Sequence, residues 1–242
     1  MANPTAAMLV IGDEILSGRT QDANTHHLAG ELSRTGINLC EVRVVGDDAR
    51  AIGEAARALS SAYSHVFTSG GIGPTHDDIT ADAIAAAFGV AIAVREDARA
   101  LLAARYDALG VELNEARLRM ARIPEGAELI DNPVSAAPGF SLGNVHVMAG
   151  VPQVFRAMLA GLLPRLNAGH APLSDSLRVD LPEGDIAGPL AVIAREFPGV
   201  SIGSYPFFED GSYGAHIVVR APDGAMLEAA MARLRAAFGG TP

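Results

Sequence analysis

A glycine-rich segment carries the residues of this chain with the clearest chemical potential. It reads Thr68-Ser-Gly-Gly-Ile-Gly-Pro-Thr-His-Asp-Asp-Ile-Thr80 and follows a short apolar stretch that we predict to be a strand. Glycines let the backbone approach a ligand closely and adopt positive φ. We predict a helix over residues 77–88 directly after the loop, and a helix start offers unpaired N–H groups and the positive end of a dipole. The segment therefore predicts a site for a phosphate-bearing small molecule. The candidate ligand-binding residues are Ser69, Gly70, Gly71, Gly73, Pro74, Thr75 and His76.

Two adjacent carboxylates, Asp77 and Asp78, make this loop unusual. Acids at a helix start stabilise the helix by roughly 0.3–1 kcal/mol, so simple capping is one interpretation. Beside a phosphate, however, both charges would repel the ligand unless a divalent cation bridges them. We favour a functional Asp78, since Asp77 alone could serve the helix. The predicted cofactor is therefore a Mg²⁺-like divalent cation.

Further acids follow two other predicted strands. Asp13 and Glu14 come directly after the apolar run at residues 8–12, and Asp47 follows a second strand predicted over residues 37–45. The carboxyl ends of parallel strands meet at one edge of a sheet, where ligands bind. We therefore expect these acids to converge on the glycine loop. The candidate metal ligands are Asp13, Glu14, Asp77 and Asp78.

Asp22 and Asn24 lie between these two strands along the chain. Taken alone, Asp22 predicts a turn, and Asn24 predicts the N-cap of a helix whose Leu28 and Leu32 face inward. For Asn24, capping and ligand contact are compatible interpretations. Asp47 taken alone would likewise predict a helix cap.

Strands and helices alternate through the first two thirds of the chain. Continuous apolar runs predict buried strands, and residues 52, 55, 56 and 59 mark the inner face of a helix. Such alternation implies parallel strands joined by right-handed crossovers. After a linker at residues 169–174, the order becomes strand-helix-strand-strand-helix. We therefore predict an α/β domain over residues 1–168 with a mostly parallel sheet, followed by a small α+β domain over residues 175–242.

The amino-acid composition excludes some classes of binding partner. The chain has 242 residues, 49% of them hydrophobic, and a formal net charge of −10 without any basic run. Nucleic acid and anionic membranes are therefore poor partners, because phosphate-rich surfaces are bound mainly by clustered Lys and Arg. Cys40 is the single cysteine, which excludes an intrachain disulfide. The first apolar run stops at Asp13, far short of a bilayer span. We expect a cytoplasmic protein that forms a homo-oligomer.

Two other groups of residues favour structural roles. The segment Tyr205-Pro-Phe-Phe208 could stack on a base, but we favour a place in the core or an interface of the small domain. His65, His146 and His216 lie in predicted strands, which is typical of hydrogen-bonded structural histidines.

Several strings of the chain resemble one family. They are IGDEILSG, GGIGPTHDD, IPEGAELIDNP, APGF and MAGVPQVFRAML, in that order between residues 8 and 166. With these strings the chain resembles the molybdopterin-binding (MoaB/Mog-type) domain family, and more narrowly CinA-type proteins and the N-terminal domain of animal-type FAD synthases. Residues 197–206 resemble the small domain that follows in the same proteins. The resemblance implies a three-layer α/β fold. We also expect the chain to lack the amidase and adenylyltransferase modules of those proteins.

The resemblance implies roles for the residues that match the family's motifs. The acid of the motif GG-x-G-x-x-x-x-D-x-T falls on Asp78, and the acid that ends the second strand falls on Asp47. Where relatives usually read Gly-Thr-Ala-Pro-Gly, this chain has Ser135-Ala-Ala-Pro-Gly139, so that a ligand-facing hydroxyl is lost or displaced to Ser135. The GDE, D-x-N and APGF elements place further metal and ligand contacts on Asp13, Glu14, Asp22, Asn24, Ser135, Pro138 and Gly139.

Three functions fit these expectations. The first, which the CinA-like resemblance suggests, is metal-dependent hydrolysis of a nucleotide pyrophosphate such as FAD or ADP-ribose, with Asp78 and Asp47 as catalytic residues that orient water or metal. The second is molybdopterin binding or transfer in molybdenum cofactor biosynthesis. The third is non-catalytic binding of a pterin or nucleotide. A phosphate-binding loop does not separate the first from the second, because both ligands carry phosphate.

Overall fold

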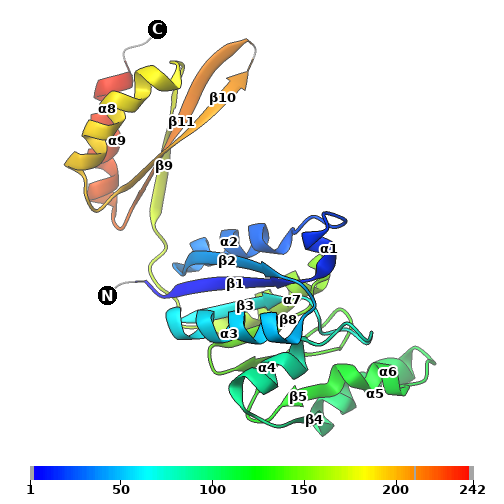
Figure 1. The fold of residues 1–242 in the computed structure, drawn as a ribbon. Helices are drawn as coiled ribbons and strands as arrows, with labels where there is room; N and C mark the ends of the chain where they lie inside the picture. Colours follow the sequence, from blue (N-terminus) through cyan, green and yellow to red (C-terminus); the bar gives the residue numbers. More distant parts are fainter. Residues whose placement is uncertain (1–2, 210, 240–242) are drawn as a thin grey trace. The chain divides into compact units, whose positions relative to one another are not determined.

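The computed structural model describes residues 3–209 and 211–239 in two compact units (Figure 1). The division falls between Gly169 and His170, at the start of the predicted linker. The extreme ends of the two predicted domains, at residues 1–2 and 240–242, lie outside the described residues. No helix within the described ranges is long and apolar enough to cross a membrane.

A six-stranded sheet with the order β2-β1-β3-β8-β7-β6 forms the centre of the first unit. Neighbouring strands from β2 to β8 are parallel, whereas β7 runs antiparallel to both of its neighbours. This confirms the predicted mostly parallel sheet. The strands are β1 (Thr5–Ile11), β2 (Asn38–Val45), β3 (His65–Ser69), β6 (Glu128–Ile130), β7 (Gly139–Leu142) and β8 (Val145–Met148).

Helices cover both faces of this sheet, as a three-layer fold requires. Alternate residues of β1 point into two separate cores: Leu9 packs with the helices α3 and α4, and Met8 packs with α2 and α7. The inner residues predicted for α3 are buried, with Ile52 and Leu59 fully so. The helices are α1 (Asp13–Leu16), α2 (Asn24–Thr35), α3 (Ala49–Ala62), α4 (Thr80–Phe88) and α7 (Pro152–Leu162), which a 3₁₀ turn, η2 (Leu163–Arg165), extends.

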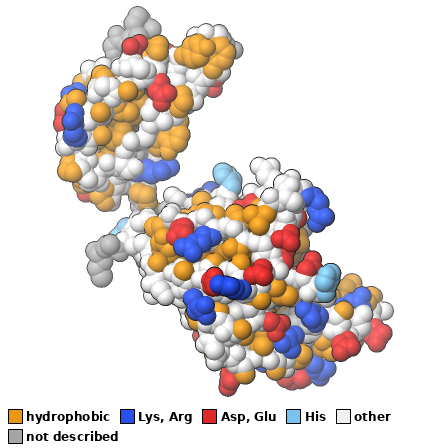
Figure 2. All heavy atoms as spheres, viewed as in Figure 1, with side chains coloured by type: hydrophobic (Ala, Val, Ile, Leu, Met, Phe, Trp, Pro, Cys, Tyr) orange, Lys and Arg blue, Asp and Glu red, His pale blue; other side chains and the backbone are white. Residues whose placement is uncertain are grey.

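A mostly helical segment lies between α4 and β6 in the chain. Its antiparallel strand pair, β4 (Ile92–Val94) and β5 (Arg122–Pro124), brackets α5 (Glu96–Ala108), α6 (Glu115–Leu118) and the 3₁₀ turn η1 (Arg119–Ala121). On the face drawn in Figure 2, basic and acidic side chains of the larger unit are interspersed rather than segregated.

Two predicted helix starts are wrong. Helix α4 begins at Thr80 instead of Asp77, because Asp78 closes a turn by donating its N–H to the carbonyl of Thr75 at 3.3 Å. In α2, Asn24 is already the first helical residue and its side chain makes no capping bond. Asp22 does this instead, since its Oδ1 accepts the N–H groups of Asn24 at 2.9 Å and Thr25 at 3.2 Å.

The second unit has the predicted order β9 (Leu173–Val179), α8 (Glu183–Glu196), β10 (Ser201–Glu209), β11 (Ser212–Ala221) and α9 (Gly224–Phe238). Its antiparallel strands form a separate sheet with the order β10-β11-β9. Both helices lie on one face of that sheet (Figure 1), over a core that contains Ile217 and Leu234.

Candidate functional site

The glycine loop lies where the strands β1, β3 and β8 end. Gly70 donates its N–H to the carbonyl of Met148 at 3.1 Å, and Gly12 donates to Val45 at 3.0 Å, so that the strand ends are tied together. Gly70 has φ +114°, and a Cβ there would lie 2.1 Å from the carbonyl oxygen of Ile11. At this position only glycine fits both the backbone conformation and the space.

The backbone of the loop is oriented by Thr80. The N–H of Thr80 donates to the carbonyl of Gly71 at 2.9 Å, and its hydroxyl donates to the carbonyl of Gly70 at 3.0 Å. Among the described residues, no acceptor is bonded to the N–H groups of Gly71, Ile72 or Gly73. Three successive backbone donors are therefore available to an anion, as in other anion-binding loops.

Asp78 lies against this loop rather than on the helix. Its Oδ2 accepts the N–H of Thr75 at 2.8 Å and also the Thr75 hydroxyl. A Cβ on Gly73 would lie 2.6 Å from the same oxygen, so the carboxylate covers the backbone of Gly73. Arg119 of η1 donates from Nη2 to the backbone carbonyl of Asp78 at 3.3 Å. Asp78 and Arg119 thus place a carboxylate and a guanidinium beside the loop.

A second carboxylate pair links the ends of β1 and β2. Asp13 donates its N–H to Oδ2 of Asp47 at 3.0 Å, and Asp47 donates its N–H to Oδ1 of Asp13 at 3.4 Å. Burial raises the pKa of Asp47, the N–H of Asp13 opposes that shift, and the charges of Asp13, Glu14 and Asp77 raise the pKa further. These acids therefore share one electrostatic neighbourhood, as the strand-end argument predicts.

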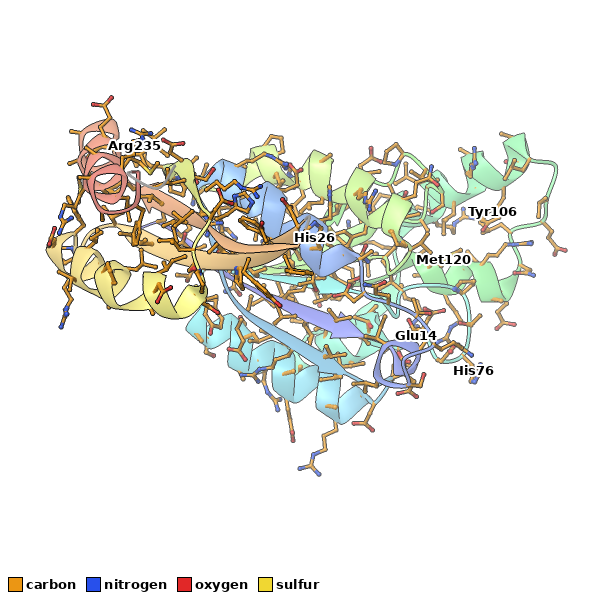
Figure 3. The ribbon with its side chains drawn as sticks, turned by 90° about the horizontal axis from the view of Figure 1, so that it is seen from above. Glu14, His26, His76, Tyr106, Met120 and Arg235 are labelled. Carbon is orange, nitrogen blue, oxygen red and sulfur yellow. The ribbon has the colours of Figure 1, made fainter. Side chains whose placement is uncertain are left out.

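A cavity of about 530 Å³ opens beside the loop. Glu14 and Met120, both labelled in Figure 3, line it together with Asp78 and Ser135. Its remaining lining residues are Thr20, residues 70–73, Asn132, Ala137 and residues 149–152 and 154. The volume lies within the usual range for small-molecule sites, and one wall is largely apolar.

Other predicted contacts lie outside this cavity. Pro138 lines a small neighbouring recess of about 20 Å³ under the loop. Gly139 begins β7, and a Cβ there would lie 2.2 Å from the carbonyl oxygen of Val147, so the glycine serves strand packing. The side chain of His76 is 98% exposed, and its Nδ1 is 3.9 Å from the Asp77 carboxylate. The hydrogen bond between Asp78 and Thr75 closes a turn with His76 and Asp77 at its centre, and Pro74 directly precedes that turn.

Asn24 and Ser69 are buried between the strand ends. Asn24 donates from Nδ2 to Oγ of Ser69 and to the carbonyl of Gly150, both at 2.7 Å. Together with Asp22 they line a recess of about 50 Å³ that also contains Glu14. Asn24 thus links β3 to the segment after β8 by hydrogen bonds. The recess it lines adjoins the larger cavity, because Glu14 and Gly150 line both.

Sequence reasoning missed Asn132, Arg119 and Met120. Asn132 is buried and donates from Nδ2 to Oγ of Ser135 at 2.7 Å and to the carbonyl of Ala137 at 2.8 Å, which holds the Ser135 loop in place. An Asn directly before a Pro in a turn was the available signal for Asn132. Arg119 and Met120 carry no such signal, because only the fold brings η1 to the loop.

The donor chemistry of the site fits a hard cation. No group of three or more His, Cys, Asp or Glu residues in the described parts of the chain is preassembled around a metal position. Mg²⁺ is commonly held by one or two carboxylates plus the phosphates of a substrate. Glu14 and Asp78 line the cavity and are the carboxylates that could share a cation with a phosphate on the loop. Asp13 and Asp47 bond to each other at the strand ends and are not among the lining residues.

Residues 7–168 match the family described as the probable molybdopterin binding domain. The chain belongs to this family. Residues 172–241 match the family described as the middle domain of FAD synthase. Both results confirm the resemblance inferred from the sequence motifs.

Individual relatives agree with this assignment. A probable FAD synthase of Caenorhabditis elegans is 32% identical over 261 aligned residues, which cover 98% of this chain and 50% of the relative. The chain therefore spans about half the length of that relative. A protein of Archaeoglobus fulgidus is 34% identical over 201 residues, covering 82% of this chain and 84% of the relative. The crystal structure of CinA from Thermoplasma acidophilum, titled as a protein of unknown function, is 34% identical with a TM-score of 0.62, covering 68% of this chain and 99% of that one.

Proposed function

We propose that this protein is a metal-dependent hydrolase of nucleotide pyrophosphates of the FAD or ADP-ribose class. One observation carries the proposal: the unbonded N–H groups of residues 71–73 and the carboxylates of Glu14 and Asp78 border the same cavity. Backbone donors bind phosphate oxygens without adding charge. The surrounding acids favour a phosphate ligand only together with a cation, which is the combination that phosphoanhydride hydrolysis uses.

In such a reaction the residues of the site have separate roles. The loop N–H groups hold the diphosphate, and the apolar wall at Met120 and Val151 accepts a planar ring or ribose. Water adds to one phosphorus, the bond from that phosphorus to the bridging oxygen breaks, and two phosphate monoesters form. Asp78, which lines the cavity beside the loop, orients the attacking water and receives its proton, whereas Asp47, which is not among the lining residues, would hold a cation together with Asp13. A bound divalent cation would supply charge neutralisation and lower the pKa of the water.

A second candidate is molybdopterin binding or transfer. The family match over residues 7–168 favours it, and the same loop suits the phosphate of a pterin ligand. Hydrolysis and pterin binding make different demands on the carboxylates, since only hydrolysis needs a positioned water.

The deciding experiment is a screen of FAD and ADP-ribose with Mg²⁺, Mn²⁺ or Co²⁺, with a chelator as the metal-free arm. The expected products are AMP with FMN from FAD, and AMP with ribose 5-phosphate from ADP-ribose, resolved by chromatography. Absence of these phosphate monoesters with every metal, together with saturable binding of molybdopterin, would establish the second candidate. Nucleotide binding without turnover would instead establish a non-catalytic binding protein.

A further inference from the structure

The small sheet of the second unit has one covered face and one open face. Ile217 and Val219 of β11 point into the core beneath α8 and α9. Strand residues alternate between faces, so His216 between Ala215 and Ile217 points the other way. In the register of the sheet, Tyr205 of β10 and Arg178 of β9 both pair with His216. These side chains therefore share the open face, which Figure 1 shows free of both helices.

Glycines lie under the aromatic rings of this face. A Cβ on Gly203 would lie 3.1 Å from Cε2 of Tyr205, and a Cβ on Gly214 would lie 2.4 Å from Cζ of Phe207. The rings therefore rest on the strand backbone. Glycine inside a strand weakens it and often marks a place where another group approaches the backbone closely. Here the groups that approach are rings, and the result is a flat aromatic surface.

Positive charge borders this surface. The guanidinium of Arg178 lies 4.1 Å from the centre of the Phe207 ring, and the His216 ring centre lies 4.9 Å from the same ring. Arg178 also pairs with Asp180 and Glu209, so its charge is largely compensated. Arg220 points to the same face, is exposed, and forms no ion pair with any described residue. An uncompensated cation is notable in a chain with a net charge of −10.

Neither Tyr205 nor Phe207 belongs to the core of the unit, and Tyr205 is 50% exposed. Of the two roles favoured from the sequence, core or interface of the small domain, the core is therefore wrong for Tyr205. Val218 is the one aliphatic side chain among the outward-facing residues of β11 between 214 and 220. Permanent protein interfaces are more apolar than this. Rings, a free arginine and little aliphatic surface favour a small planar anion over another protein.

We propose that this open face binds a mononucleotide-type ligand, with its heteroaromatic ring stacked on Tyr205 and its phosphate facing Arg220. Aromatic stacking accepts any planar ring, so adenine and flavin share the required chemistry. Arg provides the phosphate contact through a planar, permanently charged fork. The site lies in a different unit from the glycine loop, so the proposal stands independently of the proposed hydrolysis.

The test uses the full chain titrated with FMN, riboflavin and AMP. Stacking on tyrosine quenches flavin fluorescence, so FMN is expected to show saturable quenching that AMP reverses if both rings use the face. Tyr205→Ala should weaken FMN binding roughly 5- to 150-fold, the range found for loss of one stacking side chain, whereas Tyr205→Phe should retain it. Arg220→Gln should weaken binding of FMN and leave binding of riboflavin unchanged.

Phe208→Ala is the matched control. Phe208 is 62% exposed on the same strand but belongs to the opposite side of the sheet by alternation, so its removal should leave FMN binding unchanged. Thermal melting of each variant checks that the unit stays folded. Quenching that persists in Tyr205→Ala would assign the nucleotide to another site and overturn the proposal. An oligomer that dissociates in Tyr205→Ala, with no nucleotide binding by the parent, would overturn it in favour of a second copy of the chain.

Discussion

The two ends of the large sheet differ in how far their polar groups are paired by hydrogen bonds. At the end opposite the glycine loop, Ser141 bonds to Nδ1 of His146 at 2.9 Å, and Nε2 of His146 bonds to Nδ1 of His65 at 3.2 Å. At the loop end, successive N–H groups have no acceptor among the described residues and carboxylates crowd each other. Mutually satisfied polar groups stabilise a fold, whereas unpaired donors and like charges indicate a place for a ligand. The same strands thus carry a structural end and a candidate ligand-binding end.

The largest expected effect comes from breaking the loop itself. Gly70→Ala places a methyl group against the backbone carbonyl of Ile11 at a φ that disfavours alanine. We expect a loss of about 2–5 kcal/mol in the free energy of unfolding, from backbone strain together with overpacking. Gly126→Ala is the control, because its φ of +78° is also positive but nothing lies within 4 Å. It should lose only about 1–2 kcal/mol. Equal losses in urea denaturation would mean that the close approach is unimportant.

Charge removal at the candidate ligand-binding end should separate activity from stability. Asp78→Asn keeps an oxygen that can accept from Thr75, so the free energy of unfolding should change by no more than about 1 kcal/mol. Hydrolysis of a nucleotide pyrophosphate should fall on the order of a hundredfold or more, because the group that orients water or shares a cation is lost. Asp77→Asn is the matched neighbour and should be milder. Near-parental turnover in Asp78→Asn would show that Asp78 is structural.

The structural end should make the protein sensitive to acid. Burial lowers the pKa of His146 from 6.5 to about 3, with smaller contributions from His65 and Arg165. Below pH 6.5 this histidine is protonated in the unfolded chain but stays neutral in the folded chain. The free energy of unfolding therefore decreases as the pH falls from 6.5 to about 3. Between pH 7 and pH 5 the loss from this residue should be about 2 kcal/mol.

Denaturant titrations at both pH values measure this loss. His146→Gln removes this titrating group and should reduce the pH dependence, even if it lowers stability at pH 7, while His65, whose pKa burial also lowers, keeps a part of it. A parent protein equally stable at pH 7 and pH 5 would contradict a neutral, buried His146.

The smallest expected effect lies at the edge of the ligand cavity. Ser135→Ala removes one of the two acceptors of the Asn132 amide, while the carbonyl of Ala137 remains. We expect a loss of about 0.5–1.5 kcal/mol, measured as a lowered melting temperature. Ser135→Thr keeps the hydroxyl and serves as the control. If ligand binding weakens in Ser135→Ala much more than stability does, the hydroxyl also contacts the ligand.

Elements with strong apolar periodicity were predictable from the sequence. The strand β1 and the inner face of α3 follow directly from the spacing of their hydrophobic residues. The start of α4 was not predictable in this way, because adjacent Asp residues suit either a helix start or the turn that Asp78 actually closes. The strand β7 was not predictable from its sequence either, because it is only four residues long and begins at Gly139, directly after Pro138.

The candidate site was predictable only where it follows strand ends. Glu14 and the glycine loop line one cavity, and Asp13 lies beside Asp47 at the same edge, because parallel strands place their carboxyl ends together. Met120 and Asn132 also line this cavity, but they belong to segments whose position beside the loop cannot be inferred from residue spacing. The catalytic roles of Asp78 and Asp47 stay predictions, and the Asp78→Asn measurement tests the first of them.

The reciprocal bonds between Asp13 and Asp47 have a consequence for folding specificity. Strand β1 is apolar on both faces, so a shift of one residue along its neighbours would exchange its two buried faces without exposing a polar group. Burial alone therefore leaves the strand alignment poorly defined. The hydrogen bonds at the end of the strand, from Gly12 to Val45 and between the two aspartates, are available in one alignment only. Asp13 and Asp47, proposed above as site residues, thus also help to fix the alignment of β1 with β2.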